Sequence, residues 1–102
     1  VVVGGGITGL TAAYRLAQAG KKVAVIELAR IGYGETSHTT AHLTERLDIS
    51  FADLISNFGE AGASLAVQAS RKAIQLIEAT CKEIGADAQF ERVSGYLYTE
   101  RR

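Results

Sequence analysis

The 102-residue chain contains no proline, methionine or tryptophan, and it has one cysteine. A lone cysteine cannot form an internal disulfide, so nothing indicates an oxidising compartment, and we expect a cytoplasmic protein. The 11 basic and 11 acidic side chains cancel, which leaves no electrostatic footprint for nucleic acid or an anionic membrane. The apolar runs fall short of the roughly 18–20 residues that a membrane-spanning helix needs. We therefore expect neither nucleic acid nor membrane as a partner.

Both ends of the chain lie inside segments with strand character. The first residue is Val1 rather than methionine, and the valines at 1–3 run straight into glycines. A strand usually has about five or six residues, so this one begins in mid-strand. Residues 96–102 form another strand-like run, with nothing after it to pair against. We interpret the chain as a piece of a larger protein.

The first part of the sequence has the pattern of a βαβ unit. Residues 1–3 and 23–28 read as strands buried on both faces, and residues 8–19 read as a helix that Gly20 ends. One side of this helix carries residues that would let it lie close to a sheet: Gly9, Ala12, Ala13, Leu16 and Gly20. The pattern predicts the α/β class, with the two strands adjacent and parallel.

The remainder reads as a loop followed by helices. Residues 29–44 are rich in Gly, Ser, Thr and His and show no regular period. A short helix is predicted over 51–58 with Ser50 as its N-cap, and a longer one over 60–84 that Gly85 ends. Strands are predicted at 90–92 and 95–99. The long helix has one stripe at helical spacing, made of Ala66, Ser70, Ala73, Ile77, Cys81 and Ile84.

The turn between the first strand and the helix carries a glycine motif, Gly4-x-Gly6-x-x-Gly9. Gly4 permits a tight turn, Gly6 lets the backbone approach a pyrophosphate, and Gly9 lets helix and strand pack closely. The helix N-terminus offers N–H groups and partial positive charge to phosphates. Glu27, at the end of the next strand, can accept hydrogen bonds from an adenosine ribose and would repel a 2′-phosphate. The motif in this context predicts a dinucleotide-binding fold rather than a glycine-rich turn that only packs a helix.

The same residues also carry a family resemblance. Residues 1–20, followed by Val23-Ala24-Val25-Ile26-Glu27, resemble the start of FAD-dependent oxidoreductases of the D-amino-acid oxidase and glycine oxidase superfamily. Residues 34–44 resemble that family's second flavin-contacting loop. The His-Thr-Thr-Ala sequence at 38–41, Phe-Gly-Glu at 58–60 and Tyr-Leu-Tyr at 96–98 are most similar to a bacterial subgroup with a C-terminal Rieske iron–sulfur domain.

The resemblance implies the fold and the cofactor contacts. It makes residues 1–102 the N-terminal part of a FAD-binding domain: a truncated Rossmann-like fold with a parallel sheet, further helices and the first strands of a substrate domain. Thr36 and Ser37 would match a hydroxyl pair near the pyrophosphate, and residues 40–42 a stretch beside the flavin ring. The implied FAD contacts are Gly4, Gly6, Ile7, Thr8, Gly9, Glu27, Leu28, Thr36, Ser37, Thr40, Ala41 and His42.

The resemblance further implies oxidation of an amine or amino acid by hydride transfer to flavin N5. The electrons would pass to oxygen or to an iron–sulfur acceptor. The resemblance implies that this acceptor is a Rieske domain in the same full-length chain. No residue of this piece needs to be a general base, and we do not expect the piece to be active alone. Two alternatives stay open: the Rossmann domain of a NAD-dependent dehydrogenase, and a non-catalytic nucleotide-binding fragment.

The two histidines and the cysteine have simpler interpretations beside the functional ones. His38 and His42 lack an HExxH frame or a cysteine partner, so we expect no metal site and favour ordinary hydrogen bonding. Covalent attachment of the flavin to His38, as in the dimethylglycine dehydrogenase branch, is the alternative. Cys81 lies on the apolar stripe and is expected to be a buried, inert thiol.

Overall fold

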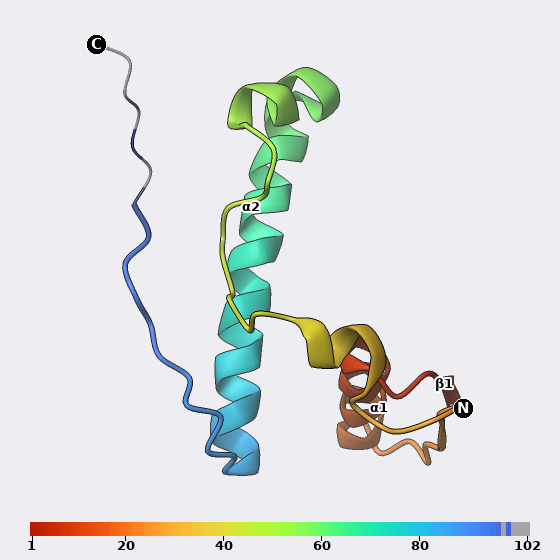
Figure 1. The fold of residues 1–102 in the computed structure, drawn as a ribbon. Helices are drawn as coiled ribbons and strands as arrows, with labels where there is room; N and C mark the ends of the chain where they lie inside the picture. The colour runs from red at the N-terminus through yellow and green to blue at the C-terminus, as the bar shows by residue number, and fades with distance from the viewer. Residues whose placement is uncertain (97, 99–102) are drawn as a thin grey trace. The chain divides into compact units, whose positions relative to one another are not determined.

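The structure is a computed structural model, which describes residues 1–96 and 98 (Figure 1). It contains two compact units, residues 1–42 and the chain from Leu43 onward. The elements follow in the order β1 (Val2–Val3), α1 (Ile7–Gln18), β2 (Val25–Ile26), the 3₁₀ helix η1 (Gly34–His38) and α2 (Phe51–Ile84). Within the described residues, no helix is both long enough and apolar enough to span a membrane.

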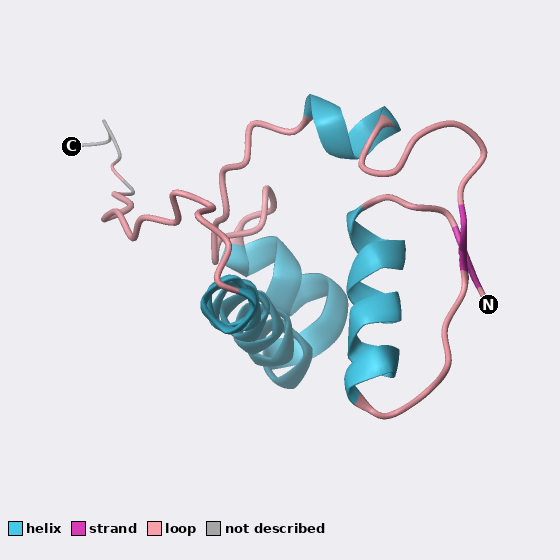
Figure 2. Ribbon diagram, turned by 90° about the horizontal axis from the view of Figure 1, so that it is seen from below, coloured by secondary structure: helices cyan, strands magenta, loops and turns pink. Residues whose placement is uncertain are grey.

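The first unit is built around the predicted βαβ arrangement. Strands β1 and β2 pair in parallel, with Val2 opposite Val25 and Val3 opposite Ile26 (Figure 2). The ladder continues past β1, where the Gly4 amide donates to the Ile26 carbonyl at 2.8 Å. The α/β class and the parallel pairing of the two strands are therefore confirmed.

Helix α1 packs against both strands, and its position depends on one glycine. A Cβ on Gly9 would lie only 1.9 Å from the carbonyl oxygen of Gly4, so a side chain at this position cannot be accommodated. Ala13, one turn further along the helix, is buried. The predicted small-residue face is correct for these two positions and wrong for Ala12 and Leu16, which are exposed because the short sheet covers only part of the helix surface.

The helix ends where the sequence predicted. Gly20 adopts a φ of +74°, and its amide donates to the Ala17 carbonyl while the Lys21 amide donates to the Leu16 carbonyl. These two hydrogen bonds form a Schellman motif, which requires a left-handed residue that glycine provides at little cost. The predicted helix over 8–19 is confirmed with its bounds shifted by one residue.

The two strands are shorter and more exposed than expected. The prediction of strands over 1–3 and 23–28, buried on both faces, is wrong in extent and in burial. Val3 is 83% exposed and Leu28 fully exposed, because helix α1 covers one face of the two-stranded sheet and no further strand pairs with it in the described residues. The apolar side chains of the two strands are typical of a sheet that is buried on both faces, and the described residues do not cover them.

The second unit consists mainly of α2, which is two helical segments joined at a break. Ser50 caps the N-terminus through its Oγ, which accepts a hydrogen bond from the Asp53 amide at 3.1 Å. Gly59 interrupts the helix with φ +70° and ψ +170°. Gly85 ends it with a φ of +64°. The predicted short helix, long helix, N-cap and glycine stop are thus confirmed.

The predicted stripe on the long helix is corrected at two positions. Of the predicted stripe, Ala66, Ser70, Ile77 and Cys81 are half-buried. Ala73 and Ile84 are exposed instead, and Ile74 takes the half-buried position on this side of the helix.

The chain after α2 also differs from the prediction. Residues 90–92 are not a strand, because a strand needs a hydrogen-bonded neighbour and β1 and β2 pair only with each other. Gly95, Tyr96 and Tyr98 have no strand structure either. Residues 97 and 99 of the last predicted strand lie outside the described residues.

Candidate functional site

The glycine turn joins the end of β1 to the start of α1. Gly4 has a φ of +100°, a conformation that favours glycine. Gly6 precedes the helix in an extended conformation and has no side chain to cap it. A Cβ on Gly6 would lie 3.1 Å from the Thr36 hydroxyl oxygen. The turn thus enters the helix without a side chain at Gly6, and the Thr36 hydroxyl lies beside it.

Gly5 is a residue of this turn that the sequence analysis did not single out. It is buried, its amide donates to Glu27 Oε2 at 2.7 Å, and its carbonyl accepts from the Gly32 amide at 2.9 Å. A Cβ there would lie 3.2 Å from atoms of both Glu27 and Ile31. The motif allows any residue at this position, so only the run of three consecutive glycines could have indicated its role.

Glu27 follows β2, and its carboxylate accepts hydrogen bonds from the backbone that follows each of the two strands. One carboxylate oxygen accepts from Gly5 and the other from the Ala29 amide at 2.9 Å. The hydrogen bond from Ala29, followed by that from Gly5, lowers the pKa of the Glu27 carboxyl because both stabilise its ionised form. A negative charge therefore stands beside the glycine turn.

The N-terminus of α1 is bonded to a hydroxyl from the following loop. The Ile7 amide donates to Thr36 Oγ1 at 3.0 Å, a contact between residues 29 positions apart in the sequence. The first N–H groups of a helix lack partners within the helix, and they carry partial positive charge. Thr8 is the next residue of this exposed first turn. The structure thus brings Thr36, Ile7, Thr8 and the glycine turn together.

Other predicted contacts lie apart from this cluster. The Ser37 hydroxyl donates to the Gly34 carbonyl within η1, so the two hydroxyls of the predicted pair have different partners. Leu28 is fully exposed. Thr40, Ala41 and His42 are also exposed, and Ala41 adopts a φ of +56°. No hydrogen bond joins these three residues to the glycine turn among those of the described residues.

The two histidines are exposed and show no metal-binding arrangement. His38 is the last residue of η1, and His42 lies in the irregular segment after it. In the part of the chain that the structure describes, no three His, Cys, Asp or Glu side chains come close enough to hold one ion.

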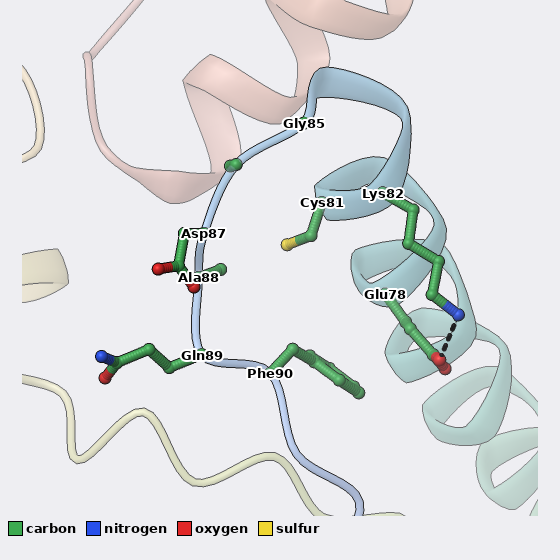
Figure 3. A pocket seen from close by; sticks show the side chains of 9 residues that line it. Glu78, Cys81, Lys82, Gly85, Asp87, Ala88, Gln89 and Phe90 are labelled. Carbon is green, nitrogen blue, oxygen red and sulfur yellow. Dashed lines mark hydrogen bonds and ion pairs between the residues drawn. The ribbon is translucent and has the colours of Figure 1, made fainter.

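A separate open pocket lies at the C-terminal end of α2, in the second unit. Its volume is about 330 Å³, and it is bounded by the end of the helix and the segment that follows (Figure 3). Glu78 forms ion pairs with Lys82 and Arg92, both at 2.7 Å, so its charge is compensated. Cys81 lines this pocket and is half-exposed, so the prediction of a buried thiol is wrong: the segment from Gly85 to Phe90 covers it only partly.

Comparison with known proteins gives the site its context. The sequence profile of a family described as FAD dependent oxidoreductase (DAO) matches residues 1–102. The chain is 38% identical over 98 residues to the putative Rieske 2Fe-2S iron-sulfur protein YhfW of Bacillus subtilis, covering 96% of this chain and 19% of that protein. It is 34% identical over 77 residues to the probable oxidoreductase OrdL of Haemophilus influenzae, covering 76% of this chain and 18% of that protein.

A shorter match has higher identity. Over 42 residues the chain is 50% identical to gamma-glutamylputrescine oxidoreductase of Escherichia coli, covering 41% of this chain and 10% of that protein. The chain thus spans about a fifth or less of the length of these relatives. No solved structure matches significantly.

Proposed function

The chain belongs to the family of FAD-dependent oxidoreductases, and from that premise we propose that residues 1–102 are the N-terminal part of a FAD-binding domain. FAD is the cofactor of this family, and the two shorter matches are named as oxidoreductases. The proposed domain is Rossmann-like, and its remaining strands and the first strands of a substrate domain would follow the βαβ unit. The observation that carries the proposal is the glycine turn with Glu27 beside it.

The residues of the first unit fit the adenosine diphosphate half of FAD. The backbone at Gly6 and the first turn of α1 would hold the pyrophosphate, since amide donors and the helix dipole favour anions there, while Gly4 and Gly9 would shape the turn beside it. The Glu27 carboxylate would accept hydrogen bonds from the ribose hydroxyls. Its fixed charge disfavours a ligand with a 2′-phosphate.

The flavin half would lie further along the loop. Thr40, Ala41 and His42 form an exposed stretch with small side chains at its centre, which suits a close approach to a planar ring. When bound, FAD supplies the group that accepts a hydride, and the protein positions it and tunes its electronics. In the sequence, Thr36 and Ser37 lie between the residues proposed for the adenosine half of FAD and those proposed for the flavin half. We propose that they contact the phosphates.

The substrate class we propose is an amine or amino acid. The name of the E. coli relative, a gamma-glutamylputrescine oxidoreductase, supports an amine. The name of the B. subtilis relative supports a Rieske iron–sulfur domain as electron acceptor in the full-length chain. A cytoplasmic location belongs to the same proposal and rests on the single free cysteine.

A spectrum of the full-length protein tests the cofactor assignment. We expect flavin absorbance bands in the purified protein, with the chromophore released on denaturation if the flavin is not covalently bound. Reduction of those bands by a panel of amines and amino acids, without added NAD, would support the substrate class. A colourless protein that binds NAD and oxidises its substrate only with NAD would contradict the proposal and favour a NAD-dependent dehydrogenase.

A further inference from the structure

Glu27 connects two backbone segments that are distant in sequence. Its Oε2 accepts from Gly5, 22 residues earlier and inside the glycine turn, and its Oε1 accepts from Ala29, just after β2. The contact to Gly5 is short, at 2.7 Å, and partly buried. Charge-assisted hydrogen bonds of this kind are stronger than those between neutral groups. The carboxylate therefore holds the turn to the end of β2.

A second connection holds the same residue of the turn. The Gly5 carbonyl accepts from Gly32 at 2.9 Å, so both backbone polar groups of Gly5 are bonded to the segment that follows β2. The space around its Cα is filled by Glu27 and Ile31. The centre of the turn is thus fixed from the β2 side, and Glu27 provides the only charged group among these contacts.

We propose that Glu27 is a positioning residue for the phosphate-binding turn, in addition to the ribose contact assigned to it above. This inference rests on the proposed FAD site. An ionised carboxylate has about four acceptor positions, and the two backbone amides occupy two of them. Acceptor capacity therefore remains for the ribose, so both roles are compatible.

The proposal predicts a coupling between two parts of the ligand. If Glu27 acted only on the ribose, its loss would not affect a ligand without ribose hydroxyls. If it also fixes the turn, its loss moves the amide of Gly5 and with it the backbone that faces the phosphates. Binding of a ligand that keeps the base, the sugar ring and the phosphates but lacks the ribose hydroxyls would then weaken as well.

The test compares two ligands on the apoprotein prepared from the holoenzyme. Glu27→Gln keeps the shape of the side chain, but its amide nitrogen cannot accept the second backbone N–H. We expect this variant to bind 2′,3′-dideoxy-ADP roughly 5- to 10-fold more weakly than the wild type does. The loss of affinity for ADP, again relative to the wild type, should be larger, because the ribose contact is weakened as well. Equal affinity of wild type and variant for 2′,3′-dideoxy-ADP would overturn the proposal.

Amide hydrogen exchange gives a readout that does not depend on any ligand. The exchange rates of Gly5 and Ala29 should rise several-fold in Glu27→Gln and stay unchanged in the control Glu35→Gln, whose carboxyl lies exposed in η1. If Glu27→Gln does not fold, Glu27→Asp replaces it, because the shorter side chain keeps the charge but cannot reach both amides. Unchanged exchange at Gly5 in the folded variant would contradict the positioning role.

The two measurements separate this proposal from the proposed function. A wild-type apoprotein that binds neither ADP nor FAD would refute the FAD site itself. Raised exchange at Gly5 with ADP binding intact in the wild type, but with equal 2′,3′-dideoxy-ADP affinity in both proteins, would leave the FAD site standing and overturn only the positioning role of Glu27.

Discussion

Three of the four glycines in the turn at residues 4–9 are required, each for its own physical reason. Gly4 needs a positive φ, Gly5 is enclosed by Glu27 and Ile31, and Gly9 meets backbone. The three reasons predict substitution costs of different size. A clash with a flexible side chain can relax, whereas a clash with a backbone carbonyl requires the helix itself to move.

Gly9→Ala should therefore be the most damaging alanine substitution in this turn. We expect it to lower the free energy of unfolding by about 3 kcal/mol, since α1 must separate from β1 to admit the methyl group. Thermal or urea unfolding measures the effect. Gly95→Ala is the matched control, because a Cβ there meets no atom within 4 Å and its φ is not positive. Equal stability of the two variants would contradict the close packing of α1 on the turn.

Thr36→Val tests the hydrogen bond between η1 and the start of α1. The variant keeps the shape of the side chain and removes the oxygen that accepts from Ile7. Loss of a helix-capping acceptor typically costs about 0.5–2 kcal/mol, and we expect the lower end because the site is exposed. Amide exchange at Ile7 should increase several-fold, while Thr40→Val, an exposed threonine in the same loop, leaves it unchanged.

The two carboxyls with lowered pKa values give a prediction for pH. Hydrogen bonds from Ala29 and Gly5 lower the pKa of Glu27, and those from Lys82 and Arg92 lower that of Glu78. A carboxyl whose folded-state pKa lies below the unfolded value of about 4.3 adds stability above that pH and loses it as the pH falls through the folded-state pKa. Carboxyl ¹³C chemical shifts should show both groups titrating below the ordinary pKa of a glutamate.

At the scale of elements, local signals predicted the structure well. The helix ends at Gly20 and Gly85, the cap at Ser50 and the break before Glu60 follow from residues within a few positions, and all four were predicted. Strand length, strand burial and the strand at 90–92 were predicted wrongly. Strands depend on neighbours that are distant in sequence, and an apolar pattern alone does not supply them.

Gly59→Ala tests the break within α2. Glycine adopts φ +70° and ψ +170° freely, whereas this region is nearly forbidden to other residues and costs roughly 1–3 kcal/mol. We expect reduced stability, or a rearrangement in which the segments at 51–58 and 60–84 join into one continuous helix. Circular dichroism and unfolding distinguish the two results, again with Gly95→Ala as control. An unchanged helix content together with unchanged stability would show that Gly59 is not required for the break.

At the scale of the whole molecule, the residues of the candidate site all lie in the first unit, residues 1–42. Sequence identified the glycine motif and Glu27 because they combine a local turn with a fixed spacing. Gly5 was missed because its importance comes from Glu27, Ile31 and Gly32, which are near it only after folding. The flavin-side contacts at 40–42 were predicted from the family resemblance, and all three residues are exposed.

One titration tests the central claim, that the first unit binds the adenosine diphosphate half of FAD. The measurement follows backbone amide chemical shifts of the ¹⁵N-labelled chain of residues 1–102 alone, without the rest of the full-length protein, as ADP and then FAD are added. The account predicts saturable shifts at residues 4–9, at Ala29 and at Thr36, none along α2, and weak affinities for the two ligands within a few-fold of each other. FAD should add shifts at 40–42 that ADP does not cause. Shifts confined to α2, or no saturable shift with either ligand, would contradict the claim.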